Sequence, residues 1–224
     1  MTTDFELIDV SHTVENGMIT YKGLPGPVIS DFLSREQSRS HYAEGTQFHI
    51  GKIEMVANTG TYLDSPFHRY PQGKDLAGLE LSSLANLDGI VVRKINSQEG
   101  AVSASDLAGL DLSGKAVLFH TGWDKHWRTE KYSDGTHPFL NREAAEGLAA
   151  AGAKLVGIDS YNIDDTAALD RPAHSILLAH NIPIVEHLSG LDRLPDRNFK
   201  FFAVPVKVKD FGTFPVRAFG IVHK

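Results

Sequence analysis

Apolar and polar positions alternate along the chain in two distinct patterns. Short runs rich in β-branched and aromatic residues, bounded by turn residues, predict strands; they cover residues 5–10, 49–57, 89–95, 116–121, 155–159, 182–187, 199–208 and 216–222. Several of these runs are almost wholly apolar, as in strands that helices cover on both faces. Segments with a capping residue at the start and glycine or asparagine at the end, 141–152 and 170–181, predict helices. The pattern therefore predicts a mixed α/β architecture.

The order of these elements predicts how some of them connect. Strand 155–159, the helix that Asp170 can cap and strand 182–187 form a plausible βαβ unit. The last two strands resemble an antiparallel hairpin around residues 209–213. Residues 30–45 are polar and have no clear period. We interpret them as a loop that closes over a pocket or meets another subunit.

Length and composition narrow the class of protein. A chain of 224 residues without a linker favours a single domain over residues 1–224. Its net charge of −6, with interspersed signs, argues against nucleic acid or an anionic membrane as a partner. We expect neither a signal peptide nor a membrane span. The lack of cysteine excludes disulfides and thiolate chemistry and fits a cytoplasmic location.

The densest group of chemically useful residues is Asn-Thr-Gly-Thr-Tyr-Leu-Asp-Ser-Pro-Phe-His at 58–68. It follows the strand 49–57, so we expect it at that strand's carboxyl end, where α/β folds usually bind ligands. Its glycine permits close backbone approach and its proline stiffens the exit. We therefore predict a rigid turn that displays Asn58, Tyr62, Asp64 and His68; the alternative is an ordinary loop.

Two further residues lie at the ends of predicted elements. His174 is near the start of the second helix, whose N-terminus favours a neutral imidazole, although a partly buried structural histidine is the alternative. Glu186 ends an apolar strand and either emerges into solvent or points into a site. Together with Asp64 and His68 they supply two carboxylates and two imidazoles. Such donors suit Zn²⁺ or Mn²⁺, and they also serve as acid and base without metal.

These residues resemble those of the cyclase-family metal-dependent hydrolases, which include bacterial kynurenine formamidase and isatin hydrolase. The family signature His-x-Gly-Thr-His-x-Asp-x-Pro-x-His matches residues 58–68 in frame, and His174 and Glu186 match a later His and Glu. The resemblance runs nearly end to end, through Ile8-Asp-Val-Ser-His12, His120-Thr-Gly-Trp123, Gly157-Ile-Asp159 and Pro215-Val-Arg-Ala-Phe219. It implies a swivelling β/β/α fold with a mixed central sheet, usually in a homodimer or higher homo-oligomer with pockets near the interface.

The resemblance also implies roles for particular residues. Asp64, His174 and Glu186 correspond to metal ligands, and His68 corresponds to a histidine that acts as general acid or base. Asn58 and Tyr62 stand where the family has its first two metal-binding histidines.

This departure leaves the divalent metal open, since an amide oxygen and a neutral phenol are weak ligands for Zn²⁺ or Mn²⁺. By nearness in sequence, His41 and His49 are candidates to replace the missing imidazoles. We expect no organic cofactor.

Two mechanisms are compatible with these residues. With metal, the ion polarises a carbonyl or activates water while His68 moves protons. Without metal, His68 or Glu186 acts as base, and Tyr62 or Asn58 stabilises an oxyanion. Both mechanisms hydrolyse the carbon–nitrogen bond of an amide or cyclic amide.

The aromatic residues bear on the substrate. Phe67, Trp123, Tyr21 and Tyr161 are candidates to line an apolar pocket, although core packing is the alternative for each. Such a pocket fits a small aromatic substrate such as N-formylkynurenine, and hence an arylformamidase of tryptophan catabolism. The competing hypotheses are a lactone or imide hydrolase and an inactive family member that binds a small molecule.

Overall fold

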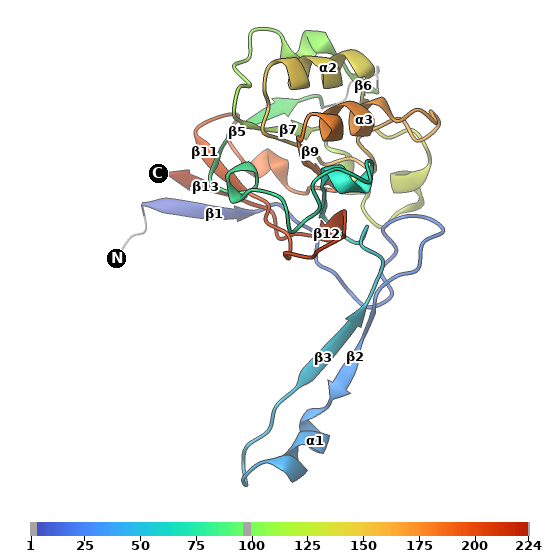
Figure 1. The fold of residues 1–224 in the computed structure, drawn as a ribbon, viewed down its shortest axis with the longest axis vertical. Helices are drawn as coiled ribbons and strands as arrows, with labels where there is room; N and C mark the ends of the chain where they lie inside the picture. The colour runs from blue at the N-terminus through green and yellow to red at the C-terminus, as the bar shows by residue number, and fades with distance from the viewer. Residues whose placement is uncertain (1–3, 96–99, 224) are drawn as a thin grey trace.

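The computed structural model describes residues 4–95 and 100–223 and is built around one mixed sheet (Figure 1). The sheet has nine strands in the order β1-β13-β11-β5-β7-β9-β10-β4-β12. Neighbours among β5, β7, β9 and β10 are parallel, and all other neighbours are antiparallel. In that order the strands are Phe5–Asp9, Phe219–His223, Phe199–Phe202, Leu87–Arg93, Ala116–His120, Leu155–Ile158, Ile184–Glu186, Tyr62–Asp64 and Thr213–Pro215.

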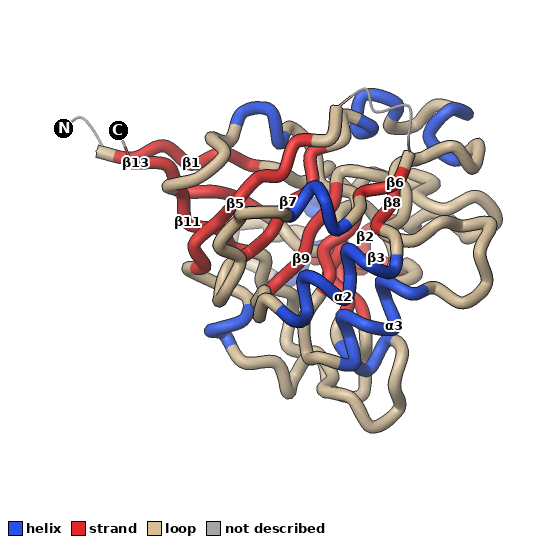
Figure 2. The backbone as a smooth tube through the Cα atoms, turned by 90° about the horizontal axis from the view of Figure 1, so that it is seen from above, coloured by secondary structure: helices blue, strands red, loops and turns tan. Residues whose placement is uncertain are grey.

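The parallel strands are apolar because both of their faces are covered. Phe119 belongs to a core cluster that includes residues of α2 (Arg142–Ala150) and α3 (Pro172–Ala179). Leu118, its neighbour in β7, belongs to a second cluster on the opposite face. Alternation along each strand thus divides the core into two layers, and α2 and α3 lie together against one of them (Figure 2).

The remaining elements are short. Strands β6 (Ala101–Val102) and β8 (Phe139–Leu140) form a parallel pair. None of the described helices is long and apolar enough to cross a membrane. The 3₁₀ helices are Arg39–His41, Pro66–His68, Leu81–Ser83, Ala104–Leu107, Trp123–His126, Glu130–Ser133 and Leu191–Arg193.

One two-stranded unit stands apart from this body. Strand β2 (Val28–Leu33) pairs antiparallel with β3 (Ile50–Glu54), and α1 (Arg35–Ser38) lies near the tip. We call residues 28–54 the arm, which projects away from the central sheet (Figure 1). Every residue of β3 is exposed, so the arm has no core of its own.

All eight predicted strands are present, with ends that differ by a few residues. Both predicted helices are present as α2 and α3. The βαβ unit is confirmed, because β9 and β10 flank α3 and pair in parallel. The mixed α/β fold is therefore as expected.

Three local predictions were wrong. The predicted rigid turn contains strand β4, and the preceding strand, β3, belongs to the arm rather than to the central sheet. The last two predicted strands do pair antiparallel, as β11 and β13, but the tight turn predicted between them is wrong, because the connecting chain crosses the sheet to form β12 beside β4. The segment 30–45, interpreted as a loop, carries most of β2 and all of α1. Strands of three residues show no readable period. The apolar residues of the arm, such as Phe32 and Ile53, are exposed, so burial imposes no regular alternation on it.

Candidate active site

Three neighbouring strands form the floor of the candidate site. In the sheet Tyr62 of β4 lies opposite Glu186 of β10, and Asp64 lies opposite Thr213 of β12. Residues directly opposite each other project from the same face, as do residues two apart in one strand. These four side chains therefore share a face, while Leu63 points the other way into the core. All of β4 is buried.

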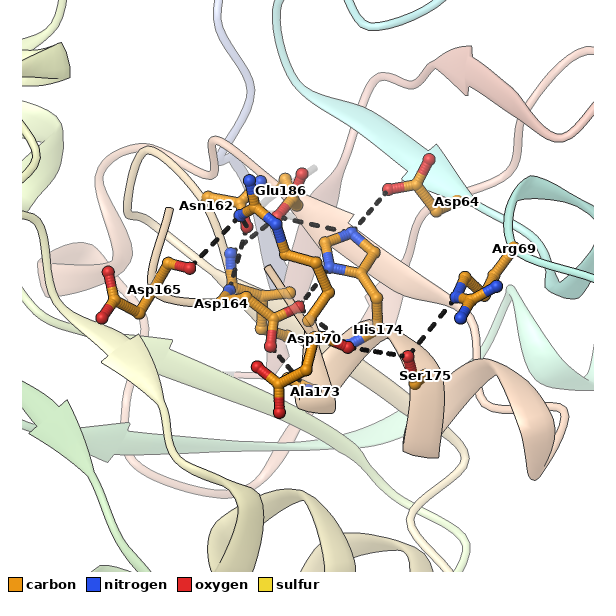
Figure 3. A network of polar contacts seen from close by, with 12 residues as sticks. Asp64, Arg69, Asn162, Asp164, Asp165, Asp170, Ala173, His174, Ser175 and Glu186 are labelled. Atoms are coloured by element: carbon orange, nitrogen blue, oxygen red, sulfur yellow. Dashed lines mark hydrogen bonds and ion pairs between the residues drawn. The ribbon is translucent and has the colours of Figure 1, made fainter. Parts of the chain in front are cut away.

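His174 reaches this face from α3 and is oriented by Asp164. The Asp164 carboxylate accepts hydrogen bonds from the backbone N–H of Ala173 (2.6 Å) and of His174 (3.0 Å), at the first turn of α3. It also lies 2.6 Å from His174 Nδ1. The other ring nitrogen, Nε2, is thereby directed to Asp64 Oδ2 (3.7 Å) and Glu186 Oε1 (3.9 Å) (Figure 3).

The carboxylates around His174 favour a cation there, contrary to the neutral imidazole expected from its place at a helix N-terminus. Burial lowers the pKa of His174, but the carboxylates of Glu186, Asp164 and Asp64 outweigh burial and raise this pKa to about 10. Asp64 Oδ2 is buried and has no hydrogen-bond partner among the described residues. A buried carboxylate oxygen without a partner is costly. The space between Asp64 Oδ2 and His174 Nε2 is therefore suited to a proton or a metal ion.

A hydrogen-bonded relay fixes the tautomer of His68. The Thr213 hydroxyl donates to Asp64 Oδ1, because the ionised carboxylate can only accept. The Thr213 oxygen also lies 2.8 Å from His68 Nδ1, and its only proton is already used. His68 must then donate from Nδ1, which leaves a lone pair on Nε2. Gly212 permits this packing, since a Cβ there would lie 2.7 Å from His68 Cα.

Glu186 is held by two phenols. Tyr62 donates to Glu186 Oε2 at 2.5 Å, Tyr21 lies 3.2 Å from the same oxygen, and the Ile163 N–H donates to Oε1 at 2.7 Å. Burial, reinforced by the charge of Glu186, raises the pKa of both tyrosines well above 10, so both keep their protons. We name this Glu186–Tyr62–Tyr21 unit the tyrosine clamp.

A cavity of about 460 Å³ opens above this floor. Six residues singled out from the sequence line it: Asn58, Tyr62, His68, His174, Glu186 and Tyr21. Its other lining residues are Leu24, Arg69, Asn162, Leu169, Asp170 and Arg171. The side chains expected to converge from separate segments thus meet around one space, with Asp64 within 4 Å of both imidazoles.

The comparisons with known proteins fit this geometry. Residues 8–165 match the family model described as "Putative cyclase". The chain belongs to the cyclase family. Kynurenine formamidase of Bacillus cytotoxicus is 29% identical over 214 residues, covering 95% of this chain and 96% of that protein. Kynurenine formamidase of Erythrobacter litoralis is 31% identical over 202 residues, covering 90% and 87%.

The fold of this cyclase-family chain is also that of a solved structure. Isatin hydrolase A from Labrenzia aggregata, bound to benzyl benzoate, superposes with a TM-score of 0.81 at 19% identity, covering 99% of this chain and 95% of that one. Curated relatives over nearly the whole length are formamidases. The chain is accordingly an amide-bond hydrolase of the cyclase family.

The expected aromatic pocket residues lie in different places in this cyclase. Phe67, Trp123 and Tyr161 are outside the cavity lining, although Tyr161 packs against Tyr21 with ring centroids 4.8 Å apart. The Trp123 indole N–H donates to the Tyr132 carbonyl, as a packing residue would. Only Tyr21 of the four faces the cavity.

The candidate replacement ligands are not near the site either. His49 lies on the arm, 2.7 Å from Asp31, and His41 lies near the arm's tip. Neither residue lines the cavity. Nearness in sequence was misleading, because the chain between His49 and Asn58 leads from the arm back to the sheet.

Several residues of the cyclase site were missed in the sequence. Thr213 carries no local signal, because its partners Asp64 and His68 lie 149 and 145 positions away in the chain. Arg171 bonds Asn162 and Asp165, 9 and 6 positions before it, in a loop that has no period to mark it. Asp164 had a usable signal, since an acidic residue that precedes a helix often bonds its first turn. Asn162, which donates to Tyr21, follows β9 at its carboxyl end, where ligand sites are expected.

The residues present fit a divalent ion, with one change from the expected set. Asp64, His68 and His174 each offer a ligand atom, and these atoms lie within 4.8 Å of one another. Oxygen and imidazole nitrogen donors suit Zn²⁺ or Mn²⁺, and Asp64 Oδ2 lacks any other partner. Glu186 is not in this group, because the tyrosine clamp and Ile163 occupy both of its oxygens.

Proposed function

We propose that this cyclase hydrolyses the amide of a small aromatic formamide of the N-formylkynurenine type, with His68 as the proton carrier. The observation that carries the proposal is the Asp64–Thr213–His68 relay at the edge of the cavity, which fixes the tautomer of a partly exposed imidazole. The names of the curated relatives support the formamide as substrate.

In the proposed reaction His68 acts first as a base and then as an acid. Its Nε2 takes a proton from water as the water oxygen forms a bond to the carbonyl carbon, and the carbonyl electron pair moves onto oxygen. The same proton then passes to the amide nitrogen as the carbon–nitrogen bond breaks. The electron pair on the oxyanion re-forms the carbonyl. The products are an aromatic amine and formic acid, which loses its proton to water as formate. Through Thr213, the charge of Asp64 stabilises the imidazolium formed in between.

Neighbouring groups would stabilise the negative oxygen of the intermediate. Asn58 lines the cavity and carries amide N–H donors. When no ion is bound, the positive charge on His174, whose pKa the surrounding carboxylates raise to about 10, lies on the same floor. The Tyr62 hydroxyl donates its hydrogen bond to Glu186. We therefore assign Tyr62 to holding that carboxylate in place rather than to direct donation to the negative oxygen of the intermediate. This assignment refines the role expected for Tyr62 from the sequence.

A divalent ion would be held mainly by Asp64 and His174, with His68 the third group within reach. When bound, Zn²⁺ or Mn²⁺ supplies Lewis acidity that polarises a carbonyl oxygen. Because Asn58 and Tyr62 replace two imidazoles and Glu186 is clamped, we expect the ion to be held reversibly. Elemental analysis after dialysis should find much less than one ion per chain. One dialysis-resistant ion per chain would contradict this expectation.

The test is turnover of N-formylkynurenine, with and without added Zn²⁺ or Mn²⁺, by wild type and by His68→Ala. We expect His68→Ala to lower kcat by roughly 10²–10⁴-fold with no change in folding, the usual range for a lost general acid–base. His180→Ala is the matched control, because His180 is an exposed residue that ends α3 outside the cavity.

Other outcomes decide between the hypotheses. Turnover of lactones or imides but not of formamides would favour the alternative hydrolase, and no turnover in any series would favour a binding protein. If His68→Ala releases a bound ion while the fold survives, His68 is a ligand rather than the proton carrier.

We also propose that the enzyme is a homodimer or higher homo-oligomer that uses the arm as a contact. Phe32 is 74% exposed and Ile53 is 56% exposed, although both are large and apolar. An isolated two-stranded hairpin is only marginally stable in water, and exposed apolar patches usually mark contacts. Lys52 pairs with Glu54 on the arm, and Asp31 lies in hydrogen-bond contact with His49, which suits a second copy of the same surface. Light scattering should give a mass of at least twice 24.5 kDa.

The proposed substrate assigns the enzyme to tryptophan catabolism in the cytoplasm. The absence of cysteine supports a reducing compartment. Fractionation of cells that express the tagged chain tests the location, and recovery outside the cytoplasmic fraction would contradict it.

A further inference from the structure

The two ends of the cavity differ in charge. Its buried end carries Glu186, with Asp64 directly beneath, and neither is more than 1% exposed. Its outer end carries Arg69 and Arg171, next to Leu169, which is 94% exposed. The cavity thus combines an acidic floor with a basic and partly apolar mouth.

The guanidinium of Arg171 has no anionic partner among the described residues. Its first amino group donates to two neutral oxygens, Asn162 Oδ1 at 3.3 Å and the Asp165 carbonyl at 3.4 Å. The Nε–H and the second amino group have no hydrogen bond to a described residue. These two groups form the edge of the guanidinium that matches the two oxygens of a carboxylate.

Arg69 adds a second unmatched charge at the mouth. Its only hydrogen bond to a described residue is a long one, from Nε to Ser175 Oγ at 3.4 Å (Figure 3). Asp170 lines the same mouth, but its carboxylate is paired with Arg142 at 2.9 Å. The mouth therefore keeps a net positive charge above an acidic floor.

Arg171 is also connected to the floor. It bonds Asn162, whose amide donates to the Tyr21 hydroxyl at 2.8 Å, and Tyr21 belongs to the tyrosine clamp on Glu186. In sequence Arg69 follows His68, and Arg171 comes three residues before His174. Both arginines line the same cavity as the two imidazoles, so a ligand whose amide lies beside the imidazoles shares that cavity with both guanidinium groups.

We propose that Arg171, assisted by Arg69, binds a carboxylate of the substrate at the mouth while the amide lies on the floor. This inference rests on the proposed amide hydrolysis and names its substrate class: aromatic amides whose carboxylate is separated from the scissile bond. The arginines make the enzyme selective for the anion over a neutral compound of the same shape. A guanidinium–carboxylate pair supplies both charge and a two-point hydrogen bond.

The test compares two substrates that differ only in charge, 3-(2-formamidobenzoyl)propanoate and its methyl ester. Wild type should favour the acid. Arg171→Met should lower kcat/KM for the acid roughly 10–100-fold, mainly through KM, because a charge-assisted hydrogen bond is lost. The ester should be nearly unaffected. Arg171→Lys should fall between the two, and Arg69→Met should act in the same direction by less, because Arg69 is more exposed.

Arg217→Met is the matched control, because Arg217 is an arginine outside the cavity whose side chain is 84% exposed. It should leave both substrates unchanged, which separates local binding from a change in net charge. Equal turnover of acid and ester by wild type would overturn the proposal. So would an equal loss for both substrates in Arg171→Met, since Arg171 would then act only by supporting Asn162 and Tyr21.

A failure of the proposed function is recognised separately. If wild type cleaves neither compound, calorimetry with 3-(2-aminobenzoyl)propanoate and its methyl ester tests the anion site directly. Tighter binding of the acid, lost in Arg171→Met, supports the site even then. Absence of binding, or equal binding of acid and ester, overturns it.

Discussion

The arm and the floor of the site come from neighbouring parts of the chain but have opposite surroundings. Strand β3 ends at Glu54 and β4 begins at Tyr62, yet every residue of β3 is exposed and every residue of β4 is buried. Both strands are short and carry apolar residues. The difference is that β4 lies between two strands of the central sheet, whereas β3 has a single partner. Local sequence therefore does not decide which strand carries chemistry and which is available for contacts.

Matched substitutions give the largest expected effect. Leu63→Asp places an unpaired charge in a fully buried position and should prevent folding or cost more than about 4 kcal/mol. Ile53→Asp, on the arm, should change stability by no more than about 0.5 kcal/mol and should weaken self-association. Denaturant unfolding and light scattering of both variants check this contrast. A large loss of monomer stability in Ile53→Asp would mean that the arm has a folding role in one chain.

The next largest effect is expected on the affinity for a divalent metal ion. In Asn58→His with Tyr62→His, two imidazoles return to the signature frame, and Glu186 is released from its bond to Tyr62. Affinity for Zn²⁺ should rise by orders of magnitude, because neutral imidazoles are much better ligands than an amide or a phenol. Calorimetric titration of both proteins is the measurement, with Asn198→His plus Tyr42→His, two exposed positions outside the cavity, as a control of equal composition. An unchanged affinity would show that the site geometry, rather than the donor atoms, limits binding.

The sequence alone does not predict most of the difference between the arm and the floor of the site. The apolar runs of the parallel strands are predictable because their surroundings are uniform on both faces. The match to the family signature identifies Asp64 and His68 as candidates. The later His and Glu of the family identify His174 and Glu186. The register of β4 between β10 and β12 is set by tertiary packing, so the Tyr62–Glu186 pairing and the role of Thr213 have no local signal. The strand 49–57 was predicted, but its place in the arm was missed, because neither β2 nor β3 buries a face.

A moderate effect is expected at Thr213. Thr213→Val keeps the shape of the buried side chain but removes the hydroxyl that joins Asp64 to His68. We expect turnover to fall about 10–100-fold, because His68 loses its fixed tautomer and orientation, which are part of the benefit of general base catalysis. Thr213→Ser retains the hydroxyl and should recover most of the activity. Equal activity of the Val and Ser variants would remove the relay from the mechanism.

The smallest effect concerns His12, which lies outside both regions and stacks on Trp127 with ring centroids 3.9 Å apart. Burial, weakly opposed by the charge of Asp124, lowers the pKa of His12 to about 4. An unfolded histidine has a pKa of about 6.5 and binds protons that the folded chain excludes, so stability falls as the pH drops from about 6.5 to 4. At pH 5 this amounts to about 1–2 kcal/mol.

His12→Phe keeps a stacked ring and removes the titration. The difference in unfolding free energy between pH 7 and pH 5 should therefore be smaller in the variant than in wild type. Identical pH dependence in both proteins would place the acid sensitivity elsewhere, for example at His187, whose pKa burial also lowers.

The bond between Asp64 and Thr213 spans 149 positions of the chain. During synthesis, β4, which carries Asp64, cannot pair with β12 until Thr213 has left the ribosome. Contacts so distant in sequence carry a large loop-closure cost and form late in folding. A nascent chain can therefore assemble its parallel strands and the core layer beneath α2 and α3 before it possesses the relay. Catalytic competence would then begin after most of the fold is in place, and an unfinished chain would hold a folded body without the ability to react.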